Sequence, residues 1–485
     1  MQLFITGVLI LLIGYFVYGK LVERIFAPDD REVPAKKFFD GLDFLVLPDW
    51  KNKLIQLLNI AGIGPVIGVI IGIKFGDIVF VIIPVGCIIA GAVHDFVAGM
   101  MSMRNKGMNL TGLVKLTAGK KIFVAFAAFM MLALLLVVAV FINIPAQLLD
   151  SLIPGNVLFP AIAVIFVYYI CATLFPVDKI IGKVYPIFGL MLLIGTCALF
   201  VKLMYDGFHD ASLLTESAQF KANMFTSAKN MPILPMLFVT IACGILSGFH
   251  ATQAPIVART ISSEKQARGV FFGMMVLEGF IAMVWAAGAL AIYNRFPEMM
   301  SSAPVKVLNQ ITDTFLSKNL SIVVIISVVI LAITSGDTAL RSLRLSLAEC
   351  FNVDQKPIGM RLLMVLPLIL LVLGLLIWSN LDAKSFNTLW NYFAWSNQVM
   401  AAFTFMAGTI YLAALKKPTF ITIIPGFFIT FVVSAYILWI SPAHGGPVGV
   451  GLELTEAYIA ALLVAIMTFA WALMRGKDMQ GKIDG

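Results

Sequence analysis

The sequence is dominated by long apolar runs that follow one another with only short polar connections. Hydrophobic residues make up 60% of the 485 residues and charged residues only 12%, whereas soluble domains have about 45–50% and about 25%. So few charges could not cover this much apolar surface in water, but a helix of about 20 apolar residues spans the hydrocarbon core of a bilayer. The chain is therefore predicted to be a polytopic all-α membrane protein, and a soluble globular fold is excluded.

About thirteen of the apolar runs are candidate transmembrane helices. They cover residues 3–18, 54–73, 78–103, 122–141, 159–174, 185–203, 233–256, 270–293, 320–340, 362–378, 389–415, 420–440 and 457–473. No connection between them is long enough for a soluble domain. The first run has no basic residue before it and no A-x-A site after it, so we expect it to remain as a helix and not to be cleaved as a signal peptide.

The basic residues indicate the orientation of these helices. Lys20 and Arg24 directly follow the first run, and most of the 34 Lys and Arg residues lie in connections on the same side as these two. Because such connections stay preferentially in the cytoplasm, we expect an outside N-terminus and a cytoplasmic C-terminus in the inner (plasma) membrane. The net charge of +8 then reflects topology and not binding of nucleic acid. The five cysteines show no C-x-x-C spacing, so neither a disulfide framework nor a zinc site follows.

The run 54–73 carries a helix-breaking motif at Gly62, Gly64 and Pro65. Proline supplies no N–H, and glycine adopts dihedral angles that other residues avoid. We expect the helix to unwind here, so that its freed backbone groups line a cavity and bind a substrate or an ion. A second interpretation stays open, because Gly64, Gly68 and Gly72 are spaced by four and could simply allow close helix packing.

The run 233–256 is interrupted in a similar way, at Ser247, Gly248 and His250. Each of the two breaks opens a group of five runs, and because five is odd the second group enters the membrane from the opposite side. This is the arrangement of LeuT-type transporters, which are built from inverted repeats. We therefore expect a peripheral helix in residues 1–20, a first repeat in 54–205, a second repeat in 232–415, and two additional helices with a cytoplasmic tail in 419–485.

Few ionisable residues lie inside the apolar runs, and each is costly there unless it faces a cavity or a partner. His94 and Asp95 lie in the second run of the first group, and Glu278 lies in the second run of the second group. Imidazole and desolvated carboxylate groups can both exchange protons near neutral pH. These three residues are candidates for coupling to protons or another cation. The alternative is a static structural pair that stabilises unwound backbone.

A third polar cluster, Thr334, Ser335 and Asp337, lies at the end of the run 320–340. Hydroxyl and carbonyl oxygens suit a hard cation such as Na⁺. In LeuT-type folds, hydroxyl groups on this helix join backbone carbonyls of the first broken helix in a sodium site, which is an analogy of fold. Alternatively, Asp337 pairs with Arg341 one helical turn later.

The sequence contains no recognisable catalytic or metal-binding motif. His94, Asp95, His250, Glu278 and Asp337 are suitable ligand types, but no H-E-x-x-H pair and no Walker-type phosphate loop is present. We therefore expect no enzyme activity, no resident metal and no cofactor, with H⁺ or Na⁺ as the coupling ion. The sequence does not indicate the oligomeric state.

Several motifs resemble the carbon starvation protein A family of bacterial inner-membrane transporters, of which this chain is a short form. The motifs are Gly62-Ile-Gly64-Pro65, Ala90-Gly-Ala-Val-His94-Asp95-Phe96, Ser247-Gly-Phe-His250-Ala-Thr-Gln253-Ala-Pro255-Ile-Val-Ala-Arg259-Thr260, Glu278-Gly279, Thr334-Ser-Gly336-Asp337-Thr338 and Trp395-Ser-Asn397-Gln398. The resemblance implies a secondary transporter with the LeuT-type core of the amino acid, polyamine and organocation superfamily. Its implied substrates are peptides or, imported with protons, pyruvate.

Both implied substrates carry a carboxylate, which the N-terminal end of a half-helix attracts through its dipole and free N–H groups. We therefore expect the substrate at the two breaks, contacting the residues Gly62, Gly64, Pro65, Ser247, Gly248, His250 and Gln253. The expected function is import of a small nutrient by alternating access. The alternatives are a gated channel or facilitator, a transporter of amino acids, and a membrane enzyme or nutrient sensor.

Overall fold

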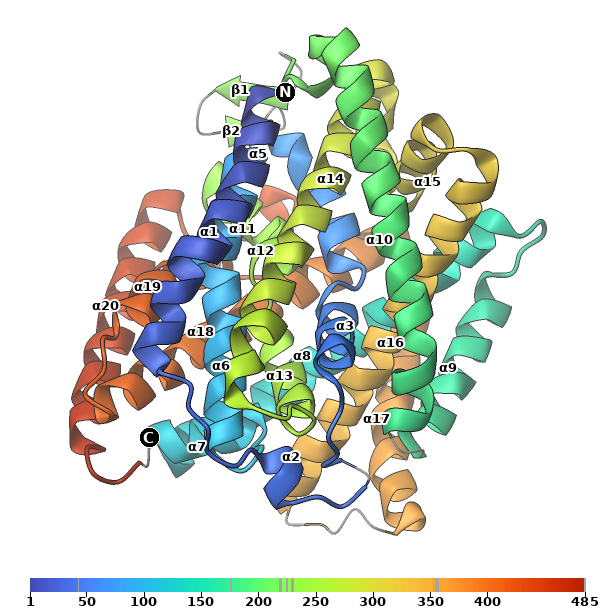
Figure 1. Ribbon diagram of the computed structural model, residues 1–485. Coiled ribbons are helices and arrows are strands. Elements are labelled where there is room, and N and C mark those ends of the chain that lie inside the picture. The colour runs from blue at the N-terminus through green and yellow to red at the C-terminus, as the bar shows by residue number, and fades with distance from the viewer. Residues whose placement is uncertain are drawn as a thin grey trace.

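The structure is a computed structural model that describes residues 1–41, 43–174, 177–217, 220–223, 226–227, 231–351, 353 and 357–483, without the side chains of 173–186, 221–230 and 383. The described chain is helical, except for one short antiparallel pair of strands, β1 (Lys221–Asn223) and β2 (Thr226–Ser227) (Figure 1). Labels with η denote short 3₁₀ or π segments.

The part of the chain before β1 contains the first break and the helices around it. Its elements are α1 (Gln2–Phe26), α2 (Pro34–Lys37), α3 (Asp49–Ile60), η1 (Gly64–Gly68), α4 (Val69–Gly72), η2 (Ile73–Phe75), α5 (Val79–Gly86), η3 (Cys87–Gly91), α6 (Ala92–Arg104), α7 (Leu110–Ala118), α8 (Lys120–Leu152), α9 (Leu158–Leu174), α10 (Val177–His209) and η4 (Ala211–Leu214).

The part after β2 contains the second break. Its elements are η6 (Ile233–Leu237), α11 (Phe238–Thr240), α12 (Ala242–Ile245), α13 (His250–Ala258), η7 (Glu264–Gln266), η8 (Arg268–Phe272), α14 (Gly273–Arg295), η9 (Pro297–Ser301), α15 (Pro304–Phe315), α16 (Lys318–Phe351), α17 (Ile358–Ser379), α18 (Ala383–Ala414), α19 (Phe420–Trp439), η10 (Pro442–His444) and α20 (Leu454–Asp478).

Within the described residues, 9 helices are long and apolar enough to cross a membrane, and two bent pairs bring the number to 11. Two of the expected runs fall outside this set. One corresponds to α9, which is shorter, and the other to α18, whose middle carries the polar sequence Ser396-Asn397-Gln398. The protein is thus a multi-pass membrane protein, while thirteen spans and the limits of the repeats stay predictions.

Both expected breaks are present as bends in the chain. The axis turns by 51° between Asp49–Ile60 and Gly64–Phe75, and by 67° between Ile233–Thr240 and Ala242–Ala258. At the second bend the chain also leaves the helix at Leu246, where the backbone is extended (φ −164°, ψ 110°), and α13 begins at His250. The motifs read from the sequence therefore do mark interrupted helices.

The glycines of the first break let the two broken helices touch. A Cβ atom on Gly64 would lie 2.2 Å from the Cβ of Cys243, and one on Gly72 would lie 2.0 Å from Cγ2 of Ile241. On Gly68 it would lie 3.2 Å from the carbonyl oxygen of Thr240. The close-packing interpretation of these glycines is therefore confirmed, and it coexists with the break.

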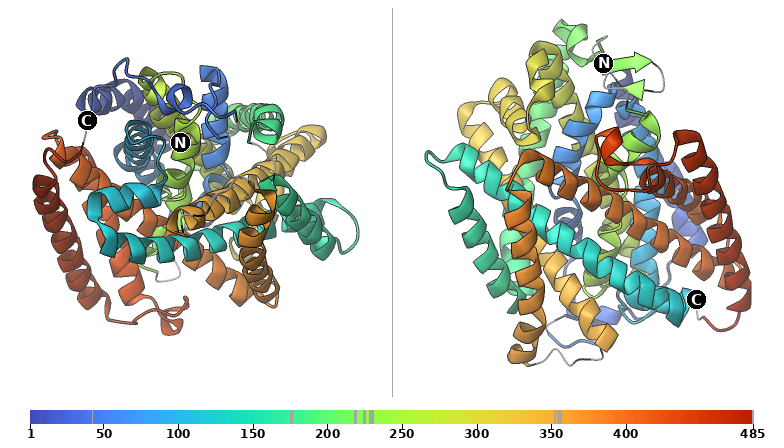
Figure 2. Two further views of the ribbon diagram at one scale, coloured as in Figure 1. Left: turned by 90° about the horizontal axis from the view of Figure 1, so that it is seen from below. Right: turned by 180° about the vertical axis from the view of Figure 1, so that it is seen from behind.

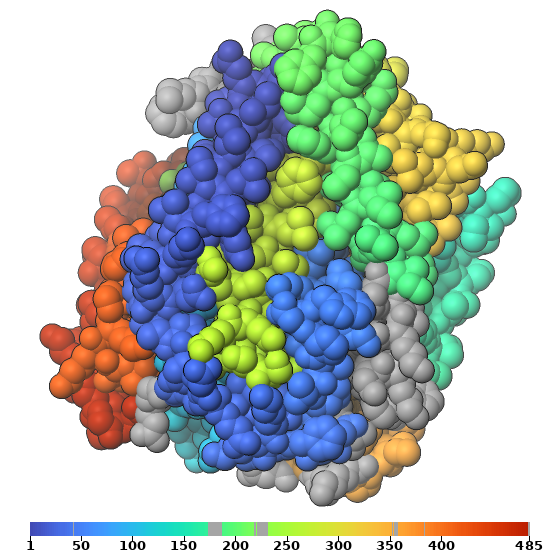
Figure 3. Space-filling model, in the orientation of Figure 1, coloured from blue at the N-terminus to red at the C-terminus, as the bar shows by residue number. Residues whose placement is uncertain are grey.

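The helix α14 runs through the centre of the bundle and is buried along most of its length. It reaches the surface of Figure 3 only as a strip between α1 and α10. Tyr293 near its end donates a hydrogen bond of 3.0 Å to the carbonyl oxygen of Ile70 in α4. On the opposite side of the molecule, α8 and α18 cross the bundle and α19 and α20 pack against α18 (Figure 2).

Candidate functional site

Four ionisable side chains form a buried chain beside the second break. His94 Nδ1 lies 2.9 Å from Asp95 Oδ1, and His250 Nδ1 lies 3.3 Å from Asp95 Oδ2. The other ring nitrogen of His250 lies 3.8 Å from Glu278 Oε2. All four residues are at most 1% exposed. We call this set the His–Asp–His–Glu cluster, and it joins α6, α13 and α14.

Small residues bring these three helices together. A Cβ on Gly91, just before α6, would lie 2.1 Å from the carbonyl oxygen of Ile245, so α6 starts against the end of α12. A Cβ on Gly279 would lie 2.7 Å from Sγ of Cys87, so α14 packs closely on η3 at the level of Glu278. The helix α13 begins at His250, and the side chain of this residue lies between Asp95 of α6 and Glu278 of α14.

The His–Asp–His–Glu cluster consists of groups that can each take up or release a proton near neutral pH. Asp95 has one imidazole at each oxygen, and His250 has one carboxylate at each nitrogen. A buried charge is tolerated only when an opposite charge or hydrogen bonds compensate it. The number of protons bound by this cluster therefore depends on the other charges near it. Among the described protein atoms, five polar atoms of the cluster have no hydrogen-bond partner: Nε2 of His94, Oδ2 of Asp95, Nδ1 of His250 and both carboxylate oxygens of Glu278.

Backbone N–H groups at the breaks are also available. Within the described residues, the N–H groups of Ser247 and Phe249 at the second break and of Ile63 at the first break form no hydrogen bond. Buried N–H groups without a partner are rare in folded proteins. By contrast, the N–H of Gly248 donates to the carbonyl oxygen of Asn397 at 2.9 Å. Gly248 is thus bound to α18 in this conformation.

Gln253, one turn along α13 from His250, faces α16. Its Nε2 donates to Oγ1 of Thr252 at 2.9 Å and to Oγ of Ser342 at 3.3 Å. Its Oε1 atom is buried without a hydrogen-bond partner among the described residues. Gln253 is therefore held between two helices, with one acceptor free.

Two amide side chains that the sequence analysis did not select lie next to the first break. Gln56 and Asn59 on α3 are both 0% exposed, and none of their amide atoms has a hydrogen-bond partner among the described residues. Their spacing of three inside an apolar run places them on one face of the helix. That spacing was a usable signal. It indicates a buried polar face of α3 just before Gly62.

The cluster on α16 is split between two faces of the helix. Ser335 Oγ donates to the carbonyl oxygen of Leu58 at 3.2 Å, and a Cβ on Gly62 would lie 3.0 Å from the same Oγ. Thr334 Oγ1 donates within its own helix to Leu331 at 2.9 Å. Asp337 lies two residues beyond Ser335 and is therefore turned by about 200° around the helix axis. It is buried, and its carboxylate interacts electrostatically with Arg341 and Arg344. Ser335 thus contacts the first break.

No three His, Cys, Asp or Glu side chains in the described part of the chain are arranged to hold a metal ion.

The connection between α1 and α3, described at residues 27–41 and 43–48, contacts the chain beyond α13, and we call it the strap. The N–H groups of Leu45 and Leu47 donate to the carbonyl oxygens of Arg259 and Thr260 at 3.2 and 3.0 Å. The guanidinium of Arg259 lies over the Phe44 ring, 5.2 Å from its centroid. The strap is thus attached to the chain directly after α13, the half-helix that begins at His250.

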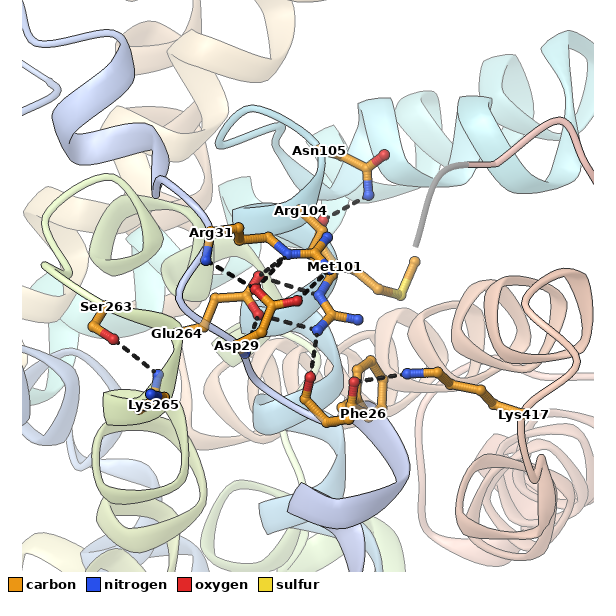
Figure 4. A network of polar contacts seen from close by, with 11 residues as sticks. Phe26, Asp29, Arg31, Met101, Arg104, Asn105, Ser263, Glu264, Lys265 and Lys417 are labelled. Atoms are coloured by element: carbon orange, nitrogen blue, oxygen red, sulfur yellow. Dashed lines mark hydrogen bonds and ion pairs between the residues drawn. The ribbon is translucent and has the colours of Figure 1, made fainter.

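An ion network, buried at Glu264 and Arg104 and exposed at Asp29 and Arg31, also holds the strap (Figure 4). Glu264, 1% exposed, receives two hydrogen bonds from Arg104, at 3.1 and 3.0 Å. It also accepts from the N–H of Asp29 at 3.3 Å and lies 3.7 Å from Nε of Arg31. Hydrogen bonds from Arg31 hold the pKa of the Asp29 carboxyl below its usual range, so this part of the network stays charged at physiological pH.

Comparison with known proteins identifies the family. The family model described as "Carbon starvation protein CstA" matches residues 1–194, 160–315 and 297–435. The chain belongs to this family. The resemblance seen in the motifs is thereby confirmed.

Relatives in the family include a transporter. An uncharacterized membrane protein of Haemophilus influenzae is 38% identical over 348 residues, which are 62% of this chain and 93% of that protein. The peptide transporter CstA of Helicobacter pylori J99 is 24% identical over 62% of this chain and 52% of its own length, and that of Escherichia coli K12 is 26% identical over 59% and 50%. The chain spans about half the length of these peptide transporters.

Solved structures show the same fold. A mutant of the manganese transporter of Eremococcus coleocola matches with a TM-score of 0.61 at 14% identity, over 91% of this chain and 99% of that one. MhsT in complex with L-phenylalanine matches with a TM-score of 0.54 at 12% identity, over 89% and 99%. The expected all-α, LeuT-type fold is therefore confirmed.

Proposed function

We propose that this protein is a secondary active transporter that imports a small carboxylate-bearing nutrient, a peptide or pyruvate, across the bacterial inner membrane together with protons. The observation that carries this proposal is the contact of His250 with both Asp95 and Glu278 directly after the second break. It supports a proton-binding role for the cluster, which lies beside the N-terminal end of the half-helix α13. Substrate and proton sites are then neighbours.

This proximity gives a physical mechanism for coupling. A carboxylate that accepts hydrogen bonds from the free N–H groups of Ser247 and Phe249 lies next to His250. Its negative charge favours the protonated cluster, and by linkage the protonated cluster favours the bound anion to the same extent. Each ligand therefore raises the affinity for the other, which is the basis of symport.

The same geometry suggests which part of the molecule moves. The His–Asp–His–Glu cluster joins α6, α13 and α14, and the glycine contacts join η1 and α4 to α11 and α12. These elements form one unit that contains both breaks. Alternating access then consists of rocking of this unit against the rest of the bundle, with the strap released when its end of the site opens.

A sodium-coupled mechanism is the second candidate, and Ser335 favours it. Its hydroxyl lies against Gly62 and Leu58, where carbonyl oxygens of the first break could join it around a hard cation. A gated channel is a third candidate, since the same broken helices could line a pore.

The test is uptake of radiolabelled pyruvate and of dipeptides into proteoliposomes under an imposed inward proton or sodium gradient, with empty liposomes as the blank. The matched pair of variants is Glu278→Gln in the cluster and Glu298→Gln, an exposed residue of η9. We expect concentrative uptake that a protonophore abolishes, that Glu298→Gln retains and that Glu278→Gln loses. Uptake driven only by sodium supports the second candidate, and mere equilibration supports the channel. Unchanged accumulation by Glu278→Gln would remove that residue from the mechanism.

A further inference from the structure

A cavity lies between α8, α18, α19 and α20, four helices whose arrangement Figure 2 shows. Its volume is about 750 Å³. Most of its lining is aliphatic or aromatic, including Ala125, Trp395, Phe403, Met467 and Trp471. We call it the lateral groove, because none of its lining residues belongs to a broken helix and several are exposed at the side of the bundle.

The lateral groove has the length of one membrane leaflet. Along α18 its lining runs from Trp395 to Met406, which is about 16 Å at 1.5 Å per residue. The hydrocarbon core of a bilayer is about 30 Å thick, so this length is about half of that thickness. An acyl chain from a single leaflet fits this length.

The groove is basic at one end only. Lys121, at the start of α8, lines it there. Arg475 of α20 is close by, since its Nε donates to the carbonyl oxygen of Thr117 at 3.2 Å and its Nη2 would lie 3.7 Å from a Cβ on Gly119. Lys120 is next in sequence and exposed. Among the described residues neither Lys120 nor Lys121 has an acidic partner.

Tryptophan lies between the basic end and the apolar part. Trp471 lines the groove one helical turn before Arg475, on the same face of α20. Tryptophan is enriched at the level of lipid headgroups, where an apolar ring meets a polar surface. From Lys121 and Arg475 the lining continues through Trp471 to mostly aliphatic and aromatic residues, Trp395 and Phe403 among them. A phospholipid has the complementary order, with an anionic phosphate at one end followed by apolar acyl chains.

We propose that the lateral groove binds one anionic phospholipid of the bilayer, with an acyl chain along α18 and the phosphate at Lys121 and Arg475. Basic pockets between transmembrane helices recognise anionic headgroups in this way. The helix α20 packs directly on α18 and α19. The bound lipid would fill the groove that remains between α20 and α8. It would attach the C-terminal helices to α8 without taking part in transport.

Two variants test the two halves of the site. Ala125→Trp fills the groove from an exposed position, and Lys121→Gln removes the charge that faces the phosphate. Their matched controls are Val164→Trp, at a position 70% exposed on α9, and Lys384→Gln, near the start of α18 and exposed. Neither control residue lines the groove. The assay is native mass spectrometry of delipidated protein with added phosphatidylglycerol or phosphatidylcholine.

We expect the unaltered protein to retain one phosphatidylglycerol roughly tenfold more tightly than phosphatidylcholine. Ala125→Trp should lose both lipids, Lys121→Gln should lose only the preference between them, and both controls should behave as the unaltered protein. Equal retention of the two lipids by the unaltered protein, or unchanged phosphatidylglycerol retention by Ala125→Trp, overturns the proposal. A dimer mass that disappears in Ala125→Trp also overturns it, because a second copy of the chain then covers the groove.

Discussion

His250 and Asp95, one in each half of the chain, meet with His250 Nδ1 3.3 Å from Asp95 Oδ2. The contact links the first turn of α13, which follows the second break, to α6. Only the side chain of His250 would therefore separate a substrate at the second break from the carboxylate of Asp95, which contacts both His94 and His250. His250 and Asp95 are both buried, so a change of protonation needs a compensating charge, which an anionic substrate would supply under the proposed function.

Asp95→Asn is expected to uncouple the protein. The amide can accept a hydrogen bond from only one of the two imidazoles and carries no charge, so the cluster loses the group that balances a protonated histidine. We expect gradient-driven uptake in proteoliposomes to fall about tenfold or more, while exchange of labelled for unlabelled substrate without a gradient continues. Asp206→Asn is the control, because it removes only a partly exposed ion pair with Lys202. Normal accumulation by Asp95→Asn would contradict proton coupling at this cluster.

Gly64→Ala is expected to disrupt the contact between the two breaks. Its Cβ would lie 2.2 Å from the Cβ of Cys243, and overpacking of this kind costs roughly 1–3 kcal/mol. The melting temperature in detergent should fall, and Cys243→Gly in the same chain should restore part of it, because the new methyl group then has space. The control is Gly359→Ala on α17, where nothing lies within 4 Å. Equal losses in the single and double variants would show that the damage arises elsewhere.

The sequence was sufficient to predict the breaks because their causes are local. Pro65 removes a donor from one helix, and Ser247-Gly248 interrupts another, whatever the rest of the chain does. It also predicted that His94, Asp95 and Glu278 share a role, since charges inside apolar runs are costly.

The sequence could not predict which residues touch. The helix α14 is apolar and buried on all sides, so its pattern does not show that Glu278 faces His250, which was expected at the substrate. Glu264 was missed for a similar reason. In sequence it is one acidic residue of a polar connection, and its burial between Arg104 and the strap depends on contacts between segments far apart in the chain.

Glu264→Gln is expected to release the strap. It leaves Arg104, whose side chain is only 2% exposed, without a counter-charge, and breaking a buried pair costs roughly 3–5 kcal/mol. Trypsin should then cut at Lys36 and Lys37 several-fold faster, as followed by gel electrophoresis. The neighbouring variant Lys265→Gln removes an exposed pair with Asp30 and should change little. If both variants are cut at the same rate, Glu264 does not hold the strap.

Gln56→Leu separates stability from function at the first break. Both polar atoms of the Gln56 side chain are buried without a partner among the described residues, and such a group costs roughly 1–3 kcal/mol in protein mutational data. Leucine removes this cost, so the melting temperature should rise. Uptake should nevertheless fall through a higher KM, because the amide is then missing beside the first break, where we expect the substrate. In Gln147→Leu, which removes a hydrogen bond of 2.9 Å to Asn143, stability should fall instead. A more stable Gln56→Leu protein with unchanged KM would assign Gln56 no part in transport.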